Sequence, residues 1–194
     1  MRTSRLEAFS DGVLAIVITI MVLELDVPHD ATLAALGDSA TGFLTYLLSF
    51  VYIGIYWSNH HHMFQVVEQV DGRVLWANLH LLFWLSLFPF TTAWVDETDF
   101  ARTPMVVYGV NLLLAAVAYY LLQLTIFRTR GGDRLKAALG RDVKGKISPG
   151  LYLAGIALAF VSSWLSFVVF TAVAVMWLVP DRRVEHYLES AGER

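Results

Sequence analysis

The chain has 194 residues, of which 57% are hydrophobic and only 16% are charged. Soluble domains are about 45–50% apolar and about 25% charged, so this composition excludes an ordinary soluble fold and favours a polytopic membrane protein. There is no cysteine, which excludes disulfides, thiolate metal sites and thiol catalysis. The net charge of −3 is uninformative for a membrane protein, and nothing in the sequence suggests a nucleic-acid partner.

Six apolar stretches predict an all-α membrane protein with one domain, residues 1–194, and six transmembrane helices. The predicted spans are about 5–26, 41–64, 74–95, 104–127, 148–162 and 164–179. Ser4 and Glu7 have the spacing of a capping box at the start of the first span. Pro89 lies inside the third span, and Pro104 fits the first turn of the fourth. Residues 27–40 and 128–146 are expected to be a polar loop and a basic loop, respectively.

The last apolar block, residues 147–179, allows two interpretations. As one helix its 33 residues would extend about 50 Å, against a hydrocarbon core of about 30 Å. A hairpin that turns near Ser162 and Ser163 is therefore favoured, although a single strongly tilted helix stays possible.

The distribution of charge predicts the orientation. With six spans, the two termini and the loops after the second and fourth spans lie on one side, which holds 13 of the 14 Lys and Arg residues and excludes only Arg102. The positive-inside rule therefore predicts cytoplasmic termini and a multi-pass protein of the cell (plasma or inner) membrane, in contact with the lipid bilayer. The other side carries six carboxylates, which either concentrate cations at an outer mouth or are simply solvated. They are Asp26, Asp30, Asp38, Asp96, Glu97 and Asp99.

The residues on one face of the first span allow two interpretations. At 100° per residue, a stripe of five residues falls within an arc of about 100°. These are Gly12, Ile16, Thr19, Ile20 and Leu23. If several copies of the helix surrounded an axis, the Ile and Leu rings would form a constriction that holds back ions by dewetting. Spacing alone favours ordinary packing instead, because every membrane helix has such a stripe.

The start of the first span is polar, with Ser10 and Asp11 pointing away from that stripe. An ionisable residue inside a span is expensive and normally has a partner. Candidate partners at the same cytoplasmic depth are Arg5, His60, His61, His62, Asn78 and His80. A buried network that docks the first helix is favoured, and a proton relay through the histidines is the alternative.

Neither a metal site nor catalysis is expected. Consecutive helical residues lie 100° apart, so three adjacent histidines cannot converge on one ion. A site would need His60 or His61 together with His80 or Asp11. The sequence shows no nucleophile with a base, no H-E-x-x-H motif and no glycine-rich phosphate loop, so we expect neither an enzyme nor a cofactor.

Three motifs nevertheless carry a family resemblance. Arg5-x-x-x-Phe9-Ser10-Asp11 opens the first span, and Trp57-x-x-His60 with Phe64 closes the second. The third span contains Asn78-Leu79 and Phe88-Pro89-Phe90-Thr91. With the six-span layout, these motifs resemble the transmembrane protein 175 family of potassium channels, which includes an endosomal/lysosomal type and a prokaryotic single-repeat branch.

The resemblance implies a homotetramer in which the first helix of each subunit lines a central pore. The family's isoleucine constriction falls on Ile16 and its pore threonine on Thr19, where K⁺ would pass transiently. Ile20 and Leu23 match further apolar pore-facing positions, and Gly12 completes the stripe. The family lacks a T-V-G-Y-G carbonyl filter, and so does this chain.

The same resemblance implies a polar network between the first three spans. Its members would be Arg5, Phe9, Ser10, Asp11, Trp57, His60 and Asn78. One departure concerns the last hairpin, where relatives often have proline and this chain has Ser163.

The sequence thus predicts a potassium-permeable cation channel with a hydrophobic isoleucine gate. No span has an Arg-rich voltage-sensor pattern, so we expect no voltage gating. The alternative is a proton-coupled secondary transporter that uses Asp11 and the nearby histidines.

Overall fold

The computed structural model describes residues 2–65, 67, 69–129, 132–139 and 142–178, with all of their side chains except those of 38, 134 and 137–139. Helices joined by loops and turns make up this part of the chain, with one isolated bridge between Arg2 and Gln69. The helices are α1 (Thr3–Leu23), α2 (Leu33–Asp38), α3 (Ala40–Gln65), α4 (Gly72–Ser86), α5 (Phe88–Glu97), α6 (Arg102–Ile126), α7 (Gly132–Leu139), α8 (Val143–Leu158) and α9 (Ser163–Leu178).

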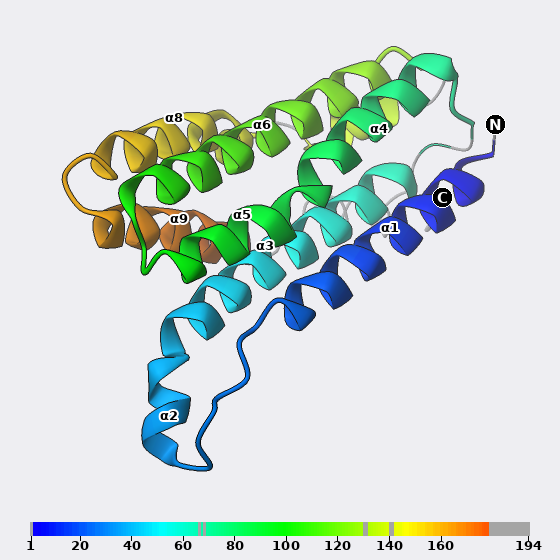
Figure 1. Cartoon of the computed structure of the whole chain (residues 1–194). Coiled ribbons are helices and arrows are strands. Elements are labelled where there is room, and N and C mark those ends of the chain that lie inside the picture. Colours follow the sequence, from blue (N-terminus) through cyan, green and yellow to red (C-terminus); the bar gives the residue numbers. More distant parts are fainter. Residues whose placement is uncertain (1, 66, 68, 130–131, 140–141, 179–194) are drawn as a thin grey trace.

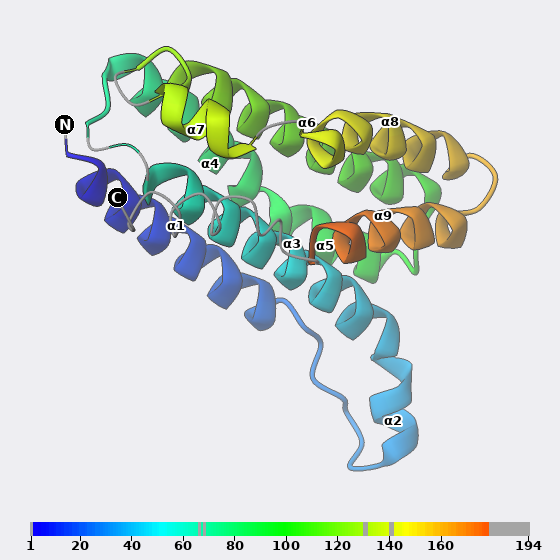
Figure 2. The same cartoon turned by 180° about the vertical axis from the view of Figure 1, so that it is seen from behind.

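The helices form a bundle with α1 along one side (Figure 1). Helix α1 packs against α3, α4 and α5, while α6 packs against α4, α5 and α8. Helix α9 lies against α8, α3 and α6. Both views show α2 projecting away from the bundle, at the end opposite the start of α1 (Figures 1 and 2).

Within the described residues, four helical segments are long and apolar enough to cross a membrane. They are Thr3–Leu23, Ala40–Gln65, Gly72–Glu97 and Arg102–Ile126. The third combines α4 and α5, which meet at Leu87 where the sequence predicts one continuous span. Pro89 explains the break, because it has no N–H to give to the carbonyl of Leu85 and its ring crowds that carbonyl.

The last apolar block consists of two helices. Helix α8 ends at Leu158 and α9 begins at Ser163, each with 16 residues. The turn therefore precedes Ser163, and one helix through residues 147–179 is excluded. The residues from 179 onward, including Arg182 and Arg183, lie outside the described part of the chain.

Three predictions of local structure are wrong. Ser4 and Glu7 do not form a capping box, because α1 begins at Thr3 and its N-cap, Arg2, makes no side-chain capping bond. The expected polar loop contains α2, whose start is capped by the Thr32 hydroxyl accepting from the Ala35 N–H at 3.2 Å. The expected basic loop contains α7.

A cluster of aromatic rings at the centre of the bundle joins helices that are far apart in sequence. The Tyr52 hydroxyl donates to the Phe170 carbonyl at 2.6 Å, which ties α3 to α9. Ser49 forms hydrogen bonds with Thr92 at 2.7 Å and with Tyr108 at 3.0 Å, which ties α3 to α5 and α6. Buried hydroxyls and carbonyls need such partners, so these bonds help to fix how the helices meet.

Candidate functional site: the two faces of α1 and its polar anchor

The two faces of α1 have opposite environments. One face is buried in the bundle through Leu6, Ser10, Leu14, Val17 and Met21. Their spacing of three and four residues is that of a single helical face.

The opposite face is uncovered and coincides with the predicted stripe. Ile16 is 60% exposed, Ile20 40% and Leu23 80%, and Gly12 and Thr19 are exposed as well. In a membrane, such an apolar face contacts lipid or another protein chain.

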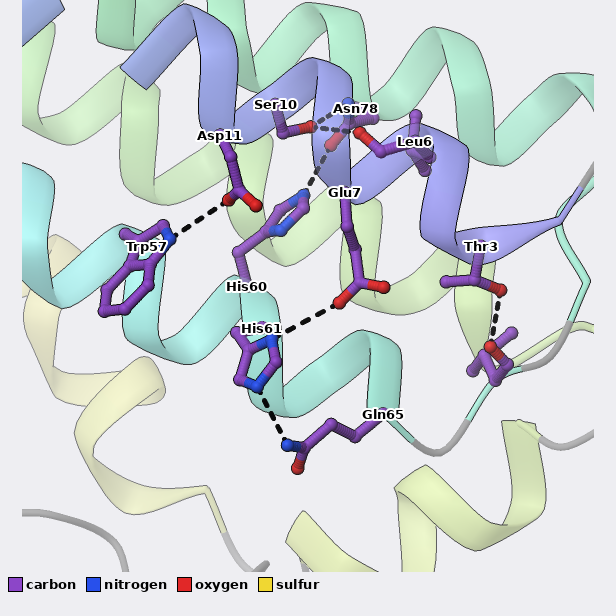
Figure 3. Close-up of polar contacts among 11 residues, drawn as sticks. Thr3, Leu6, Glu7, Ser10, Asp11, Trp57, His60, His61, Gln65 and Asn78 are labelled. Atoms are coloured by element: carbon purple, nitrogen blue, oxygen red, sulfur yellow. Dashed lines mark hydrogen bonds and ion pairs between the residues drawn. The ribbon is translucent and has the colours of Figure 1, made fainter. Parts of the chain in front are cut away.

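A chain of buried hydrogen bonds joins α1, α4 and α3 (Figure 3). The Asn78 amide donates to the Ser10 hydroxyl at 3.0 Å, and that hydroxyl donates to the Leu6 carbonyl at 3.0 Å. The Asn78 carbonyl oxygen lies 2.8 Å from His60 Nε2, so this nitrogen carries the proton. All three side chains are buried, so this network fixes how α1, α3 and α4 pack against one another.

A second row of contacts joins α1 to α3 at the edge of this buried network (Figure 3). The Trp57 indole donates to the Asp11 carboxylate at 3.0 Å. One turn away, His61 Nδ1 lies 3.4 Å from the Glu7 carboxylate, and His61 Nε2 accepts from Gln65 at 2.9 Å. Glu7 and Asp11 are four residues apart, as are Trp57 and His61, so the two helices present matching rows in antiparallel register.

The structure thus joins Ser10, Asn78 and His60 in one series of hydrogen bonds. Asp11 and Trp57 form a separate hydrogen-bonded pair. Arg5 and Phe9 are exposed, and neither side chain makes a hydrogen bond or ion pair with any described residue.

The remaining histidine candidates do not join this network. His62 makes no hydrogen bond with a described residue, and His80 accepts from Trp84 at 3.0 Å on its own helix. Among the described residues, no group of three or more His, Cys, Asp or Glu is arranged to hold a metal ion.

Sequence reasoning missed Glu7 and Gln65 as partners of His61, and the bond from the Thr3 hydroxyl to the Val67 carbonyl at 2.5 Å. The repeated four-residue spacing was a signal that pairs Glu7 with His61. No sequence pattern indicated the Thr3 contact, because it depends on how the link between α3 and α4 returns towards the start of α1.

The chain is similar in sequence to several known proteins. The model of the family described as endosomal/lysosomal potassium channel TMEM175 matches residues 5–89. A potassium channel of Chryseobacterium sp. (strain P1-3) is 49% identical over 190 residues, covering 97% of this chain and 99% of the relative. A mouse endosomal/lysosomal proton channel TMEM175 is 34% identical over 112 residues, which is 52% of this chain but 22% of that protein.

A solved structure is similar as well. The crystal structure of a lysosomal potassium-selective channel TMEM175 homolog from Chamaesiphon minutus matches with a TM-score of 0.74 and 34% identity. The match covers 91% of this chain and 96% of that one. Sequence and fold agree over almost the whole chain, which belongs to the TMEM175 family.

Proposed function

We propose that this protein is a potassium-permeable, non-voltage-gated cation channel of the cell membrane. It acts as a homotetramer in which four copies of α1 surround the pore and the two helices of the α8–α9 pair complete six spans. The observation that carries the proposal is the uncovered stripe on α1 of a chain that is 49% identical to a bacterial potassium channel over nearly its full length. The family consists of channels rather than enzymes, which agrees with the lack of catalytic motifs.

Ile16 is the residue proposed to form the constriction. Its side chain is 60% exposed and lies about one and a half helical turns beyond Asp11. Four such side chains around an axis would form an apolar ring that a hydrated ion crosses only at a free-energy cost, because the narrow passage dewets.

Thr19 supplies the oxygen nearest to this ring. Its hydroxyl donates to the carbonyls of Ala15 and Ile16 at 3.1 and 2.9 Å. With the proton turned to the helix backbone, the oxygen lone pairs are free to face a cation in the pore.

The outer end of the stripe is acidic. An open groove there is lined by Ile20 of α1, by the C-cap residue Glu24, and by Phe90, Trp94 and Glu97 of α5. Two carboxylates at this mouth would raise the local concentration of cations.

Flux measurements test the proposal. Purified protein in liposomes is expected to pass K⁺ in preference to Na⁺. Ile16→Asn is expected to enlarge the leak by about tenfold or more, because removing about 1.4 kcal/mol of barrier raises a rate tenfold. Val22→Asn is the matched control, since Val22 is 45% exposed on α1 but outside the stripe.

Two outcomes would contradict the proposal. Liposomes that pass no cation would exclude a channel, and an equal leak in both variants would exclude Ile16 as the constriction.

The second candidate is proton-coupled transport through Asp11 and the neighbouring histidines. It is favoured by the exposed Asp11 carboxylate on α1; the name of the mouse relative, a proton channel, supports proton movement but not a transport cycle. This candidate predicts saturable, stoichiometric flux that Asp11→Asn abolishes. Unitary currents in single-channel recordings would exclude it.

A further inference from the structure

A cavity unrelated to α1 lies between α3, α6, α8 and α9. It has a volume of about 50 Å³ and is partly open to solvent. None of its lining residues belongs to α1, so it is separate from the proposed pore.

The walls of this cavity are aromatic. Five tyrosines and Trp177 line it, and α3, α6 and α8 all contribute tyrosine rings. Several of the tyrosines are almost fully buried, whereas Tyr120 is 52% exposed. Ring faces of Tyr and Trp attract cations through their quadrupole, more strongly where water is excluded.

Among the described lining residues, every polar side chain except the Trp177 indole can accept a hydrogen bond. Asp142 caps the start of α8, with one carboxylate oxygen accepting from the Gly145 N–H at 2.8 Å, and the other oxygen is not used by this cap. The Gly145 carbonyl lacks its helical donor, because the residue four positions later is Pro149. None of the lining residues in the described part of the chain is Lys, Arg or His, although Lys144 and Lys146 flank Gly145 in sequence.

Gln123 supplies an independent observation. Its side chain lines the cavity, is only 4% exposed and makes no hydrogen bond with any described residue. Its amide is not among the fully enclosed unpaired groups, so water or a ligand in the cavity can reach it and form hydrogen bonds with it.

We propose that this cavity binds a small organic ammonium ion, held by the aromatic rings and by the Asp142 carboxylate, with its N–H groups donating to Gln123. The same chemistry occurs in a free alkylamine and in the headgroup of an aminophospholipid. Binding does not depend on ion conduction.

The test is calorimetric titration of purified protein in a maltoside detergent with n-butylammonium and with butan-1-ol, its neutral isostere. The ammonium ion is expected to bind at least about tenfold more tightly, because only it gains from the carboxylate and the ring faces. Equal affinity of the two probes would show an apolar cavity only, and no binding of butylammonium would show a water site only; either result overturns the proposal.

Matched variants locate the site. Asp142→Asn is expected to weaken binding about tenfold or more while the fold is kept, because Asn also caps helices. Asp133→Asn makes the same charge change at an exposed position on α7 and is expected to leave binding unchanged. Tyr120→Leu is expected to weaken binding by about 3- to 30-fold, and Tyr120→Phe, which keeps the ring, is expected to retain it.

Two further measurements distinguish a lipid headgroup from a free amine as the ligand, and the cavity from the pore as the binding site. Dihexanoylphosphatidylethanolamine binding more tightly than butylammonium would identify a lipid headgroup as the ligand, and weaker binding would identify a free amine; both outcomes support an ammonium site. Ile16→Asn is expected to leave affinity unchanged. Affinity that responds to Ile16→Asn but not to Asp142→Asn would place the ion in the pore and overturn the proposal.

Discussion

Two buried asparagines, Asn78 and Asn111, have opposite surroundings. Asn78 is fully buried and hydrogen-bonded to both Ser10 and His60. Asn111 is 3% exposed, and neither its amide nitrogen nor its oxygen has a partner among the described residues. The same side chain therefore stabilises the fold at one position and is unfavourable within the subunit at the other.

Replacement of each asparagine by leucine is expected to have effects of opposite sign. Asn78→Leu removes the acceptor of the His60 Nε2–H group and the donor to the Ser10 hydroxyl, and is expected to lower the free energy of unfolding by about 1–3 kcal/mol. Asn111→Leu removes an unpaired amide and is expected to raise it by about 1 kcal/mol. Denaturant titration of the two purified variants in detergent measures both values. A destabilised Asn111→Leu protein would show that this amide has a partner in another subunit.

At the level of helices, Phe170 decides how closely α6, α8 and α9 approach. Its ring packs against the backbone of Gly109 on α6 and of Gly155 on α8. A side chain at either glycine would collide with the ring, so both positions require glycine for close approach.

Gly155→Ala is therefore expected to destabilise the protein by about 1–3 kcal/mol through overpacking. Gly54→Ala is the matched control, because nothing lies within 4 Å of the added Cβ atom in the middle of α3. Alanine there is expected to stabilise the helix by up to about 1 kcal/mol. Thermal unfolding in detergent compares the pair. Equal midpoints would mean that Phe170 moves aside at little cost.

For the whole molecule, the proposed arrangement has six spans and both termini in the cytoplasm. Four segments of the described chain are long and apolar enough to be spans, α9 is a shorter apolar helix, and α8 would have to supply the sixth span. The bridge between Arg2 and Gln69 places the start of α1 beside the link between α3 and α4, as the topology requires.

The lack of native cysteine makes this topology easy to test. Gln69→Cys and Asp99→Cys place single thiols at exposed positions of opposite predicted sides. In intact cells, a membrane-impermeant maleimide is expected to label Asp99→Cys, while Gln69→Cys reacts only after the membrane is opened. Labelling of both variants in intact cells would contradict the predicted orientation. Light scattering of the purified protein tests the tetramer, and a stable monomer would contradict it.

Much of the fold and of the site was predictable, because apolar length and the positive-inside rule act on the sequence directly. The long helices and the separate last pair followed from these patterns. The short helices α2 and α7 did not, since six or eight residues form a helix only where caps and neighbours support them.

Within the site, the positions of Ser10, Asp11, Trp57, His60 and Asn78 were identified from sequence, but their pairing was not. Pairing depends on the rotation and depth of α1 against α3 and α4, and tertiary packing sets both. That packing leaves Arg5 exposed while Ser10 is buried, although both residues are polar and lie near the start of α1.

The sequence by itself indicated a helical membrane protein, predicted its orientation from the distribution of charge, and identified which residues lie together on one face of α1. Only the tertiary structure decided that this face is left uncovered by the subunit, and that five tyrosines from three helices surround one cavity. The physical reason is the separation along the chain of the residues that set each property. Helix periodicity and charge bias are local properties of the chain, whereas exposure and cavities arise from contacts between residues far apart in sequence.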